Sequence, residues 1–173
     1  YASDGSVSDH QVVFYLGAHE TVATERLTAA LFSVFGVSCT TTNSNSVART
    51  VVSNRILAEF FSDFGRRADL KVLPNFAMAS RPEFRRGIVE GLIDGDGCLY
   101  GKRAMLRTTS AKLAWQLRLI LWSEGLHGSM RTSPAGTWEI EGRQGESKPL
   151  HTVEWRPVRQ ARGSIAQTND IVY

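Results

Sequence analysis

Two aspartates, Asp94 and Asp96, stand at the end of the segment GIVEGLIDGDG (87–97). Carboxylates are the oxygen ligands that Mg²⁺ takes while keeping several of its waters. Two carboxylates brought close together repel unless a cation lies between them. Two acids at the end of a helix that another backbone can approach indicate a paired acidic site at a helix–helix seam. A local alternative stays open, in which Asp96 only caps the turn before Gly97. Asp94 is interpreted as a structural acid that bonds within its own helix end.

The glycines of this segment indicate how a second acid could be brought to Asp96. Gly87, Gly91 and Gly95 recur every four residues and share one face of a helix. Each glycine inside a helix costs about 1 kcal/mol relative to alanine. The usual compensation is the close approach of another backbone. The pattern therefore predicts that a second helix packs against this face and ends in an acid of its own.

An internal repeat supplies that second acid. Asp4-Gly5 aligns with Asp96-Gly97 at a separation of 92 residues, and in both copies an apolar run and an amphipathic helix follow. Self-similarity over this length indicates a duplicated supersecondary unit. The duplication relates Asp4 and Asp96 by a pseudo-twofold axis.

The sequence VEGLIDGDG at 89–97 resembles the nine-residue signature of the LAGLIDADG homing endonucleases, and SDG at 3–5 resembles the tail of a first copy. The resemblance implies two signature helices packed face to face. It also implies a divalent metal, Mg²⁺ or Mn²⁺, for DNA cleavage. The implied metal-site residues are Asp4, Asp96, Gly5 and Gly97.

A further match, KVLP at 71–74, resembles the K-x-[ILV]-P element of intein-borne members, 25 residues before the second acid. In that element Lys71 is the catalytic-site base. The alternative is an exposed linker lysine. Repeat symmetry predicts a second basic catalytic residue, for which Lys148 and Arg156 are the candidates.

The resemblance implies an α+β fold of two pseudo-symmetric αββαββα repeats. Their antiparallel sheets are expected to form a DNA-binding saddle, with the signature helices at the interface. The expected domains are residues 1–81 for the first repeat and linker, 82–157 for the second repeat, and 158–173 for a segment leading back towards an intein splicing domain. Within the last segment NDIVY (169–173) resembles the start of a splicing strand. The first signature is cut at Tyr1, so the chain is expected to be a segment of a longer polypeptide.

Charge is distributed unevenly along the chain. Residues 1–97 hold 9 Lys and Arg against 11 Asp and Glu, whereas residues 98–173 hold 11 against 6. A basic surface attracts polyanions, and basic side chains on a sheet can reach phosphates and base edges in the major groove. A solvated basic face explains any single arginine equally well. The expected DNA-binding residues are Lys102, Arg103, Arg107, Arg131, Arg143 and Arg156.

Apolar periodicity predicts the elements that carry these residues. Pro82 and Glu83 suit the first turn of the signature helix. The other expected elements are a strand over 11–18, a helix over 22–35, a hairpin of 37–42 and 47–52, a helix capped by Ser53, strands over 98–101 and 102–109, a helix over 110–124, strands around Trp138 and Val153, and a polar loop over 142–149.

The composition is that of an ordinary globular chain of 173 residues, with 42% hydrophobic and 21% charged residues. There is no apolar run of the 18 residues that a membrane span needs, and Cys39 and Cys98 are interpreted as reduced, small apolar fillers. We therefore expect a cytoplasmic, monomeric protein. Its expected partners are double-stranded DNA with a long asymmetric site and, if embedded in an intein, a host protein domain.

Two alternatives differ from a homing endonuclease. The first is a catalytically inactive family member that binds DNA or RNA, like a maturase or a regulator. Retention of both Asp4 and Asp96 argues against it. The second is an enzyme acting on small phosphorylated substrates, which is disfavoured by the basic second half and by the lack of a glycine-rich phosphate loop.

Overall fold

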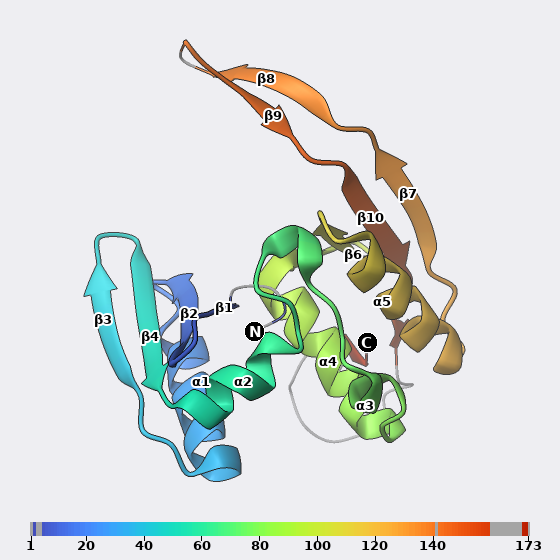
Figure 1. Cartoon of the computed structure of the whole chain (residues 1–173). Helices are drawn as coiled ribbons and strands as arrows, with labels where there is room; N and C mark the ends of the chain where they lie inside the picture. Colours follow the sequence, from blue (N-terminus) through green and yellow to red (C-terminus); the bar gives the residue numbers. More distant parts are fainter. Residues whose placement is uncertain (1, 3–4, 141, 160–170, 173) are drawn as a thin grey trace. The chain divides into compact units, whose positions relative to one another are not determined.

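The computed structural model describes residues 2, 5–140, 142–159 and 171–172. The chain forms two compact units, Tyr1–Arg67 and Ala68–Tyr173, each of which has its own antiparallel sheet (Figure 1). The linker residues 68–81 thus pack with the second unit. The boundary expected at 81/82 separates the two copies of the repeat and not the two packed units. It stays a prediction.

The first unit is a four-stranded sheet covered on one face by two helices. The strand order is β1-β2-β4-β3, with all neighbours antiparallel. Its elements are β1 (Gly5–Val7), β2 (Gln11–Gly17), α1 (Thr21–Phe35), β3 (Thr40–Ser44), β4 (Val47–Ser53) and α2 (Arg55–Ser62).

The core of this unit lies between the sheet and its helices. Val12 and Phe14 of β2 pack with Leu31 of α1 and with Phe61 of α2. The rings of Phe14 and Phe61 meet edge to face, with centroids 5.9 Å apart. The aromatic stripe that continues at Phe64 is therefore core, as its helical spacing predicted.

The second unit has a larger set of elements around a sheet of order β5-β6-β10-β7. They are η1 (Ala68–Leu70), α3 (Asn75–Met78), α4 (Pro82–Asp96), β5 (Gly97–Tyr100), β6 (Arg103–Thr108), α5 (Ala111–Ser123), β7 (Ser129–Ser133), β8 (Gly136–Ile140), β9 (Arg143–Ser147), β10 (Leu150–Trp155), β11 (Val158–Arg159) and β12 (Ile171–Val172).

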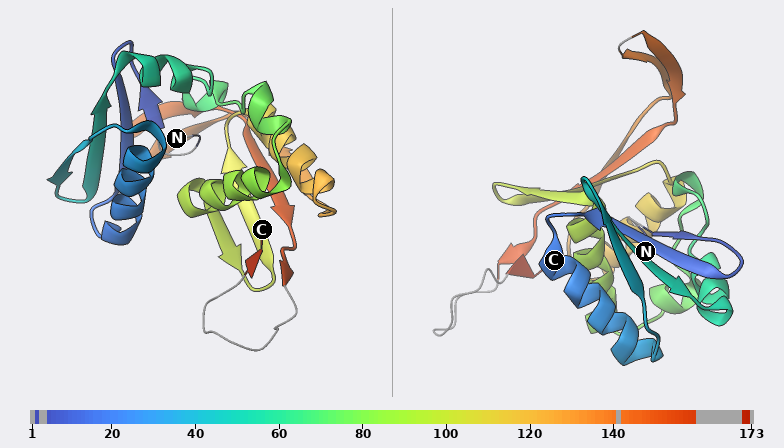
Figure 2. Two further views of the ribbon diagram at one scale, coloured as in Figure 1. Left: turned by 90° about the horizontal axis from the view of Figure 1, so that it is seen from below. Right: turned by 90° about the vertical axis from the view of Figure 1, so that its left-hand side faces the viewer.

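Helices α4 and α5 contact the same sheet (Figure 2). Leu106, Val153 and Trp155 are buried on the face that these helices cover. The opposite face, which we call the open face, carries the exposed side chains of β6 and β7. The strands β11 and β12 form a separate two-stranded pairing. Residues 160–170 and Tyr173 lie outside the described residues, so the splicing-strand interpretation of 169–173 stays a prediction.

The strand registers support the internal repeat. Gly5 lies opposite Phe14 in the first unit, and Gly97 lies opposite Leu106 in the second. Both residues of the second pair stand 92 positions after their counterparts, which is the offset of the Asp-Gly alignment. The strand order is also the same, with β10 in the place of β4.

The two copies differ in the connection between their last two strands. In the first copy, β3 and β4 are joined by the two-residue turn Asn45-Ser46. Thr41 pairs with Thr50 in the first copy, and Met130 pairs with Val153 at the corresponding register position of the second copy. The chain between the paired residues is therefore 14 residues longer in the second copy. The added residues form the β8–β9 hairpin, which extends away from the sheet (Figure 1).

Three local expectations need correction. The helix α2 is capped by Asn54, whose side chain accepts the Leu57 N–H at 3.0 Å, rather than by Ser53. The segment 142–149 is not a loop, because β9 pairs with β8 and Trp138 packs against Gly145. The expectation for the cysteines holds only for Cys39, since Cys98 is exposed.

Among the described residues, every helix is too short or too polar to cross a lipid bilayer.

Candidate catalytic site and nucleic-acid interface

Asp96 is the last residue of α4, and Gly97 begins β5 without any connecting residue. The Gly97 N–H donates to the Ile93 carbonyl, so the backbone itself closes the turn that Asp96 was alternatively expected to cap. A Cβ at Gly97 would lie 2.5 Å from the Ile93 Cα, which explains the need for glycine. The abrupt junction leaves Asp96 exposed at the helix end, as is Asp94.

Asp4 lies outside the described residues, so its pairing with Asp96 stays a prediction. Its neighbour Gly5 is half-buried at the start of β1, in the register position that Gly97 has in β5. Within the described parts of the chain, no three His, Cys, Asp or Glu side chains cluster. A pair of carboxylates that supplies only oxygen ligands fits a hard cation such as Mg²⁺.

The glycine face of α4 is open within the described residues. A Cβ added at Gly87 or Gly91 would meet no atom within 4 Å. The opposite face of the helix buries Val89, Leu92 and Ile93. Packing inside the second unit therefore does not explain these two glycines.

Lys71 is buried, with 4% of its surface exposed. This contradicts the alternative of an exposed linker lysine. Its carbonyl oxygen accepts a hydrogen bond from the Ser110 hydroxyl at 2.5 Å, and Leu73 is bonded to the Gln116 side chain. The lysine is thus held against the start of α5.

Lys148 stands just before β10, and its Nζ lies 2.7 Å from Oδ2 of Asp69 in η1. Lys71 instead follows β4 and α2, and β4 is the counterpart of β10. The strand correspondence therefore does not relate Lys148 to Lys71, which removes the symmetry argument for a second catalytic lysine there. A catalytic role for Lys148 stays untested.

The open face of the second sheet brings together three of the expected DNA-binding arginines. Register places Arg107, Thr152 and Arg131 in one row across β6, β10 and β7. The two arginines are exposed, whereas Thr152 between them is buried. Arg103, at the start of β6, lies on the same face as Arg107. These three arginines on one face of the sheet are called the basic stripe.

An acid moderates this stripe. Glu154 lies beside Arg103 on the open face and forms an ion pair with it. The hydrogen bond from Arg103 holds the pKa of Glu154 below its ordinary value, and the same pair raises the pKa of Arg103. Arg103 is therefore partly neutralised, while Arg107 and Arg131 carry the net positive charge of the face.

The remaining expected DNA-binding residues do not join this row. Lys102 lies in the turn between β5 and β6, Arg143 begins β9 on the hairpin, and Arg156 follows β10. All three side chains are exposed. Their contact with DNA stays a prediction.

Sequence reasoning missed the equivalent face of the first unit. Tyr15, Arg49 and Thr42 form one row across β2, β4 and β3, and all three are exposed. This face carries a single arginine, together with the Gln11 amide and with hydroxyl and apolar side chains of the described strands. Charge counting overlooked it because the first half is slightly acidic in total. The alternation of Arg49 with the buried Ala48 and Thr50 was the available signal.

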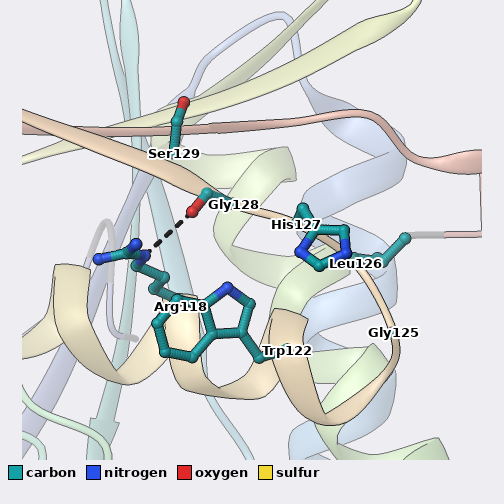
Figure 3. A pocket seen from close by; sticks show the side chains of 7 residues that line it. All are labelled: Arg118, Trp122, Gly125, Leu126, His127, Gly128 and Ser129. Atoms are coloured by element: carbon teal, nitrogen blue, oxygen red, sulfur yellow. Dashed lines mark hydrogen bonds between the residues drawn. The ribbon is translucent and has the colours of Figure 1, made fainter.

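A hollow of about 540 Å³ lies between the end of α5 and the start of β7 (Figure 3). The Arg118 guanidinium lies over the Trp122 ring at 4.4 Å and over the Trp115 ring at 5.1 Å, and its Nε donates to the Gly128 carbonyl at 3.0 Å. The cation at this hollow is thus engaged in structural contacts. None of the expected site residues lines it.

Comparison with known proteins finds a family match over part of the chain. Residues 83–149 match the LAGLIDADG-like domain. The ATP-dependent DNA helicase Hel308 of Thermococcus kodakarensis is 30% identical over 153 residues, which cover 79% of this chain and 13% of the helicase. The DNA-directed RNA polymerase subunit Rpo1C of Methanocaldococcus jannaschii is 41% identical over 54 residues, covering 31% of this chain and 6% of the subunit. The chain thus spans only a small part of either relative.

Solved structures share the fold at low sequence identity. Mesophilic variants of the homing endonuclease I-DmoI match with a TM-score of 0.64 and 10% identity, covering 88% of this chain and 82% of theirs. I-DmoI in complex with DNA and Mn matches at 0.59 and 12%, covering 84% and 73%. Full-length DUF199/WhiA from Thermotoga maritima matches at 0.53 and 11%, covering 91% and 48%. The chain therefore contains a LAGLIDADG-like domain and has the α+β fold of the LAGLIDADG homing endonucleases.

Proposed function

We propose that the protein is a site-specific endonuclease that cleaves both strands of DNA with a divalent metal held by Asp4 and Asp96. The observation that carries the proposal is the duplicated Asp-Gly junction. The offset of 92 residues found in the sequence recurs in the registers of Gly5 with Phe14 and Gly97 with Leu106. Two acids at equivalent positions of two equivalent units suit a reaction performed once on each strand.

Cleavage of a phosphodiester needs a nucleophilic water, neutralisation of the phosphate and stabilisation of the leaving oxygen. A bound Mg²⁺ or Mn²⁺ supplies charge neutralisation and activates water. Asp96, beside Gly97 at the exposed end of α4, holds a carboxylate where a phosphate can approach. Lys71 acts as the base or stabilises the charge that develops on the phosphate.

The metals used with a related fold support the choice of metal. I-DmoI has been solved with DNA and Mn, with DNA and Ca, and, as a variant, with its target DNA in the presence of Mg. Those ions belong to that protein. By resemblance we propose Mg²⁺ or Mn²⁺ for this chain.

The substrate is proposed to be double-stranded DNA with a long, asymmetric site, bound by one copy of the protein. The two sheets have the same strand order but different open faces. One presents the basic row of Arg107, Thr152 and Arg131, and the other presents Tyr15, Arg49 and Thr42. Because arginine prefers guanine edges and hydroxyls are less selective, unequal faces favour unequal half-sites.

An intein origin is also proposed. The two relatives, a helicase and an RNA polymerase subunit, have unrelated activities, and this chain spans 13% and 6% of them. A segment common to small parts of both supports an inserted element rather than a part of either host activity. The host protein domain would then be a covalent partner.

The proposal is tested by incubating the protein and a plasmid library of candidate sites with Mg²⁺. We expect linear products from the wild type. We expect none from Asp96→Asn, which should still shift DNA in a gel. Asp94→Asn is the matched control on the same helix end and should retain cleavage. DNA binding without cleavage, across metals and sites, would support the inactive DNA-binding alternative instead.

A further inference from the structure

The segment that carries Lys71 is fixed by a buried polar network at the start of α5. Lys71, Thr108, Ser110 and Gln116 are each at most 9% exposed. A buried polar group without a partner costs about 1–3 kcal/mol, so such groups persist in a core only when they are bonded. In this network the side chains of Ser110 and Gln116 bond to the backbone of residues 71–73.

Gln116 makes the more specific contact. Its Oε1 accepts the Leu73 N–H at 2.8 Å, and its Nε2 donates to the Leu73 carbonyl at 2.7 Å. One amide thus satisfies both backbone groups of a residue 43 positions earlier in the chain. Gln116 stands among Leu113 and Leu117 on the buried face of α5, where an aliphatic side chain would suit the core.

Ser110 makes the contact closest to the lysine. Its hydroxyl accepts the Leu113 N–H at 3.1 Å, which caps α5, and donates to the Lys71 carbonyl at 2.5 Å. The Ser110 N–H donates in turn to the Thr108 hydroxyl at 3.1 Å. To cap α5, the side chain of residue 110 only needs to accept the Leu113 N–H. The hydrogen bond that Ser110 donates to the Lys71 carbonyl is not needed for the cap and therefore has a separate role.

We propose that Ser110 and Gln116 are positioning residues for Lys71, a role that rests on the function proposed above. Ser110 holds the carbonyl of the lysine itself, and Gln116 holds the backbone of Leu73, a little further along the same segment. These two anchors tie the backbone of Lys71 to α5, so that the backbone position of the lysine follows that of the helix. A displacement of about 1 Å at a reacting group can cost about 100-fold in rate, so fixed backbone geometry has a direct catalytic value.

The serine variants separate the cap from the anchor. Ser110→Thr keeps both bonds and Ser110→Ala loses both. Ser110→Asp, while its carboxyl is ionised, keeps an acceptor for the Leu113 N–H but has no proton to donate to the Lys71 carbonyl. Gln116→Met removes the amide at similar length. Gln116→Glu is the second variant at that position, since it retains the acceptor for the Leu73 N–H. Leu119→Ala, on the exposed face of α5, is the control.

The measurement is single-turnover cleavage of each strand at saturating protein, together with the Kd for DNA and the thermal unfolding midpoint. We expect Gln116→Met and Ser110→Asp to slow cleavage by about 10- to 100-fold while the Kd changes less than about threefold. Ser110→Thr and Leu119→Ala should cleave like the wild type. Because one lysine serves one strand, nicked plasmid should accumulate in the slowed variants.

The outcomes distinguish the two proposals. If the wild type never cleaves, the proposed function fails and the positioning role fails with it. If Lys71→Met cleaves at the wild-type rate, the endonuclease function stands, but Lys71 has no catalytic role and the positioning inference is overturned. If Lys71→Met is slow but the Ser110 and Gln116 variants cleave both strands at the wild-type rate, only the positioning role is overturned. A uniform slowing of both strands that follows the loss of thermal stability would show a purely structural role, and it also overturns the inference.

Discussion

The hydroxyl of Ser110 lies 2.5 Å from the carbonyl oxygen of Lys71, across 39 residues of sequence. This bond ties the linker before α4 to the start of α5. It explains why the compact units divide at Arg67/Ala68, ahead of the repeat boundary expected at 81/82. The segment with the candidate base therefore belongs physically to the unit that carries Asp96.

Gly97→Ala should destabilise the second unit. The added Cβ would lie 2.5 Å from the Ile93 Cα and 2.9 Å from the Ile93 carbonyl oxygen, and backbone atoms cannot move aside cheaply. We expect a loss of about 1–3 kcal/mol in the free energy of unfolding, measured by urea denaturation. Unchanged stability would mean that the junction between α4 and β5 is looser than described.

Gly91→Ala, on the same helix, tests the close packing that the glycine spacing predicts. Among the described atoms a Cβ there meets none within 4 Å, and alanine favours a helix interior by about 0.5–1 kcal/mol over glycine. If a second helix packs against this face as expected, the substitution should lower the unfolding midpoint in urea. A rise would show that the glycine face stays open and would contradict the interface between two signature helices.

Arg107→Ala should weaken DNA binding in a way that depends on salt. Arg107 belongs to the exposed row that includes Arg131, and loss of one phosphate contact lowers the slope of log K against log[salt] by about 1. Fluorescence anisotropy at several salt concentrations measures this slope. Arg55→Ala, at the start of α2 on the helix-covered side of the first sheet, should leave the slope unchanged.

Glu154→Gln should tighten DNA binding. The substitution removes the acid that is paired with Arg103 and so adds positive charge to the open face. Anisotropy should give a lower Kd at low salt and a smaller difference at high salt. An unchanged Kd would mean that DNA does not reach this part of the sheet.

The same pair has a defined pH dependence. The pKa of Glu154 is lowered from 4.5 by the hydrogen bond with Arg103, so the ionised pair favours the folded state above the unfolded pKa. That contribution is lost as pH falls through the lower folded value. An NMR titration of the Glu154 carboxyl should give a midpoint below 4.5, and Arg103→Ala should raise it. A midpoint that Arg103→Ala leaves unchanged would contradict the pairing.

The repeat could be predicted from the sequence because the position after the last helix residue, Asp96, has no room for a side chain and requires glycine. Gly97 cannot carry a Cβ beside Ile93, so the Asp-Gly step survives as a recognisable landmark. The burial of Lys71 could not be predicted in this way. It depends on bonds from Ser110 and Gln116, and residues so far along the chain leave no periodic signal near KVLP.

The strand β9 was missed for a related reason, whereas its partner β8 was expected around Trp138. The side chains of β9 are largely exposed on both faces, so no alternation of apolar and polar residues marks this strand. Its pairing depends on cross-strand contacts such as Trp138 against Gly145, and on the Gln144 amide donating to Glu139 at 2.9 Å. Because residues 142–149 are polar, the sequence predicted a loop there instead of a strand.

The two cysteines should report on where DNA binds. Cys98 is exposed, and its partner in the β5–β6 register is Met105 of the open face. Cys39 packs against the core of the first unit, and burial raises its pKa above 9.0, which lowers its thiolate fraction. A thiol reagent at mildly alkaline pH should therefore modify Cys98 first. Added target DNA should slow that reaction while the slower labelling of Cys39 stays constant, as mass spectrometry of each cysteine would show. Equal labelling of Cys98 with and without saturating DNA would place the bound duplex away from the start of β5, and would contradict the open face as the binding surface.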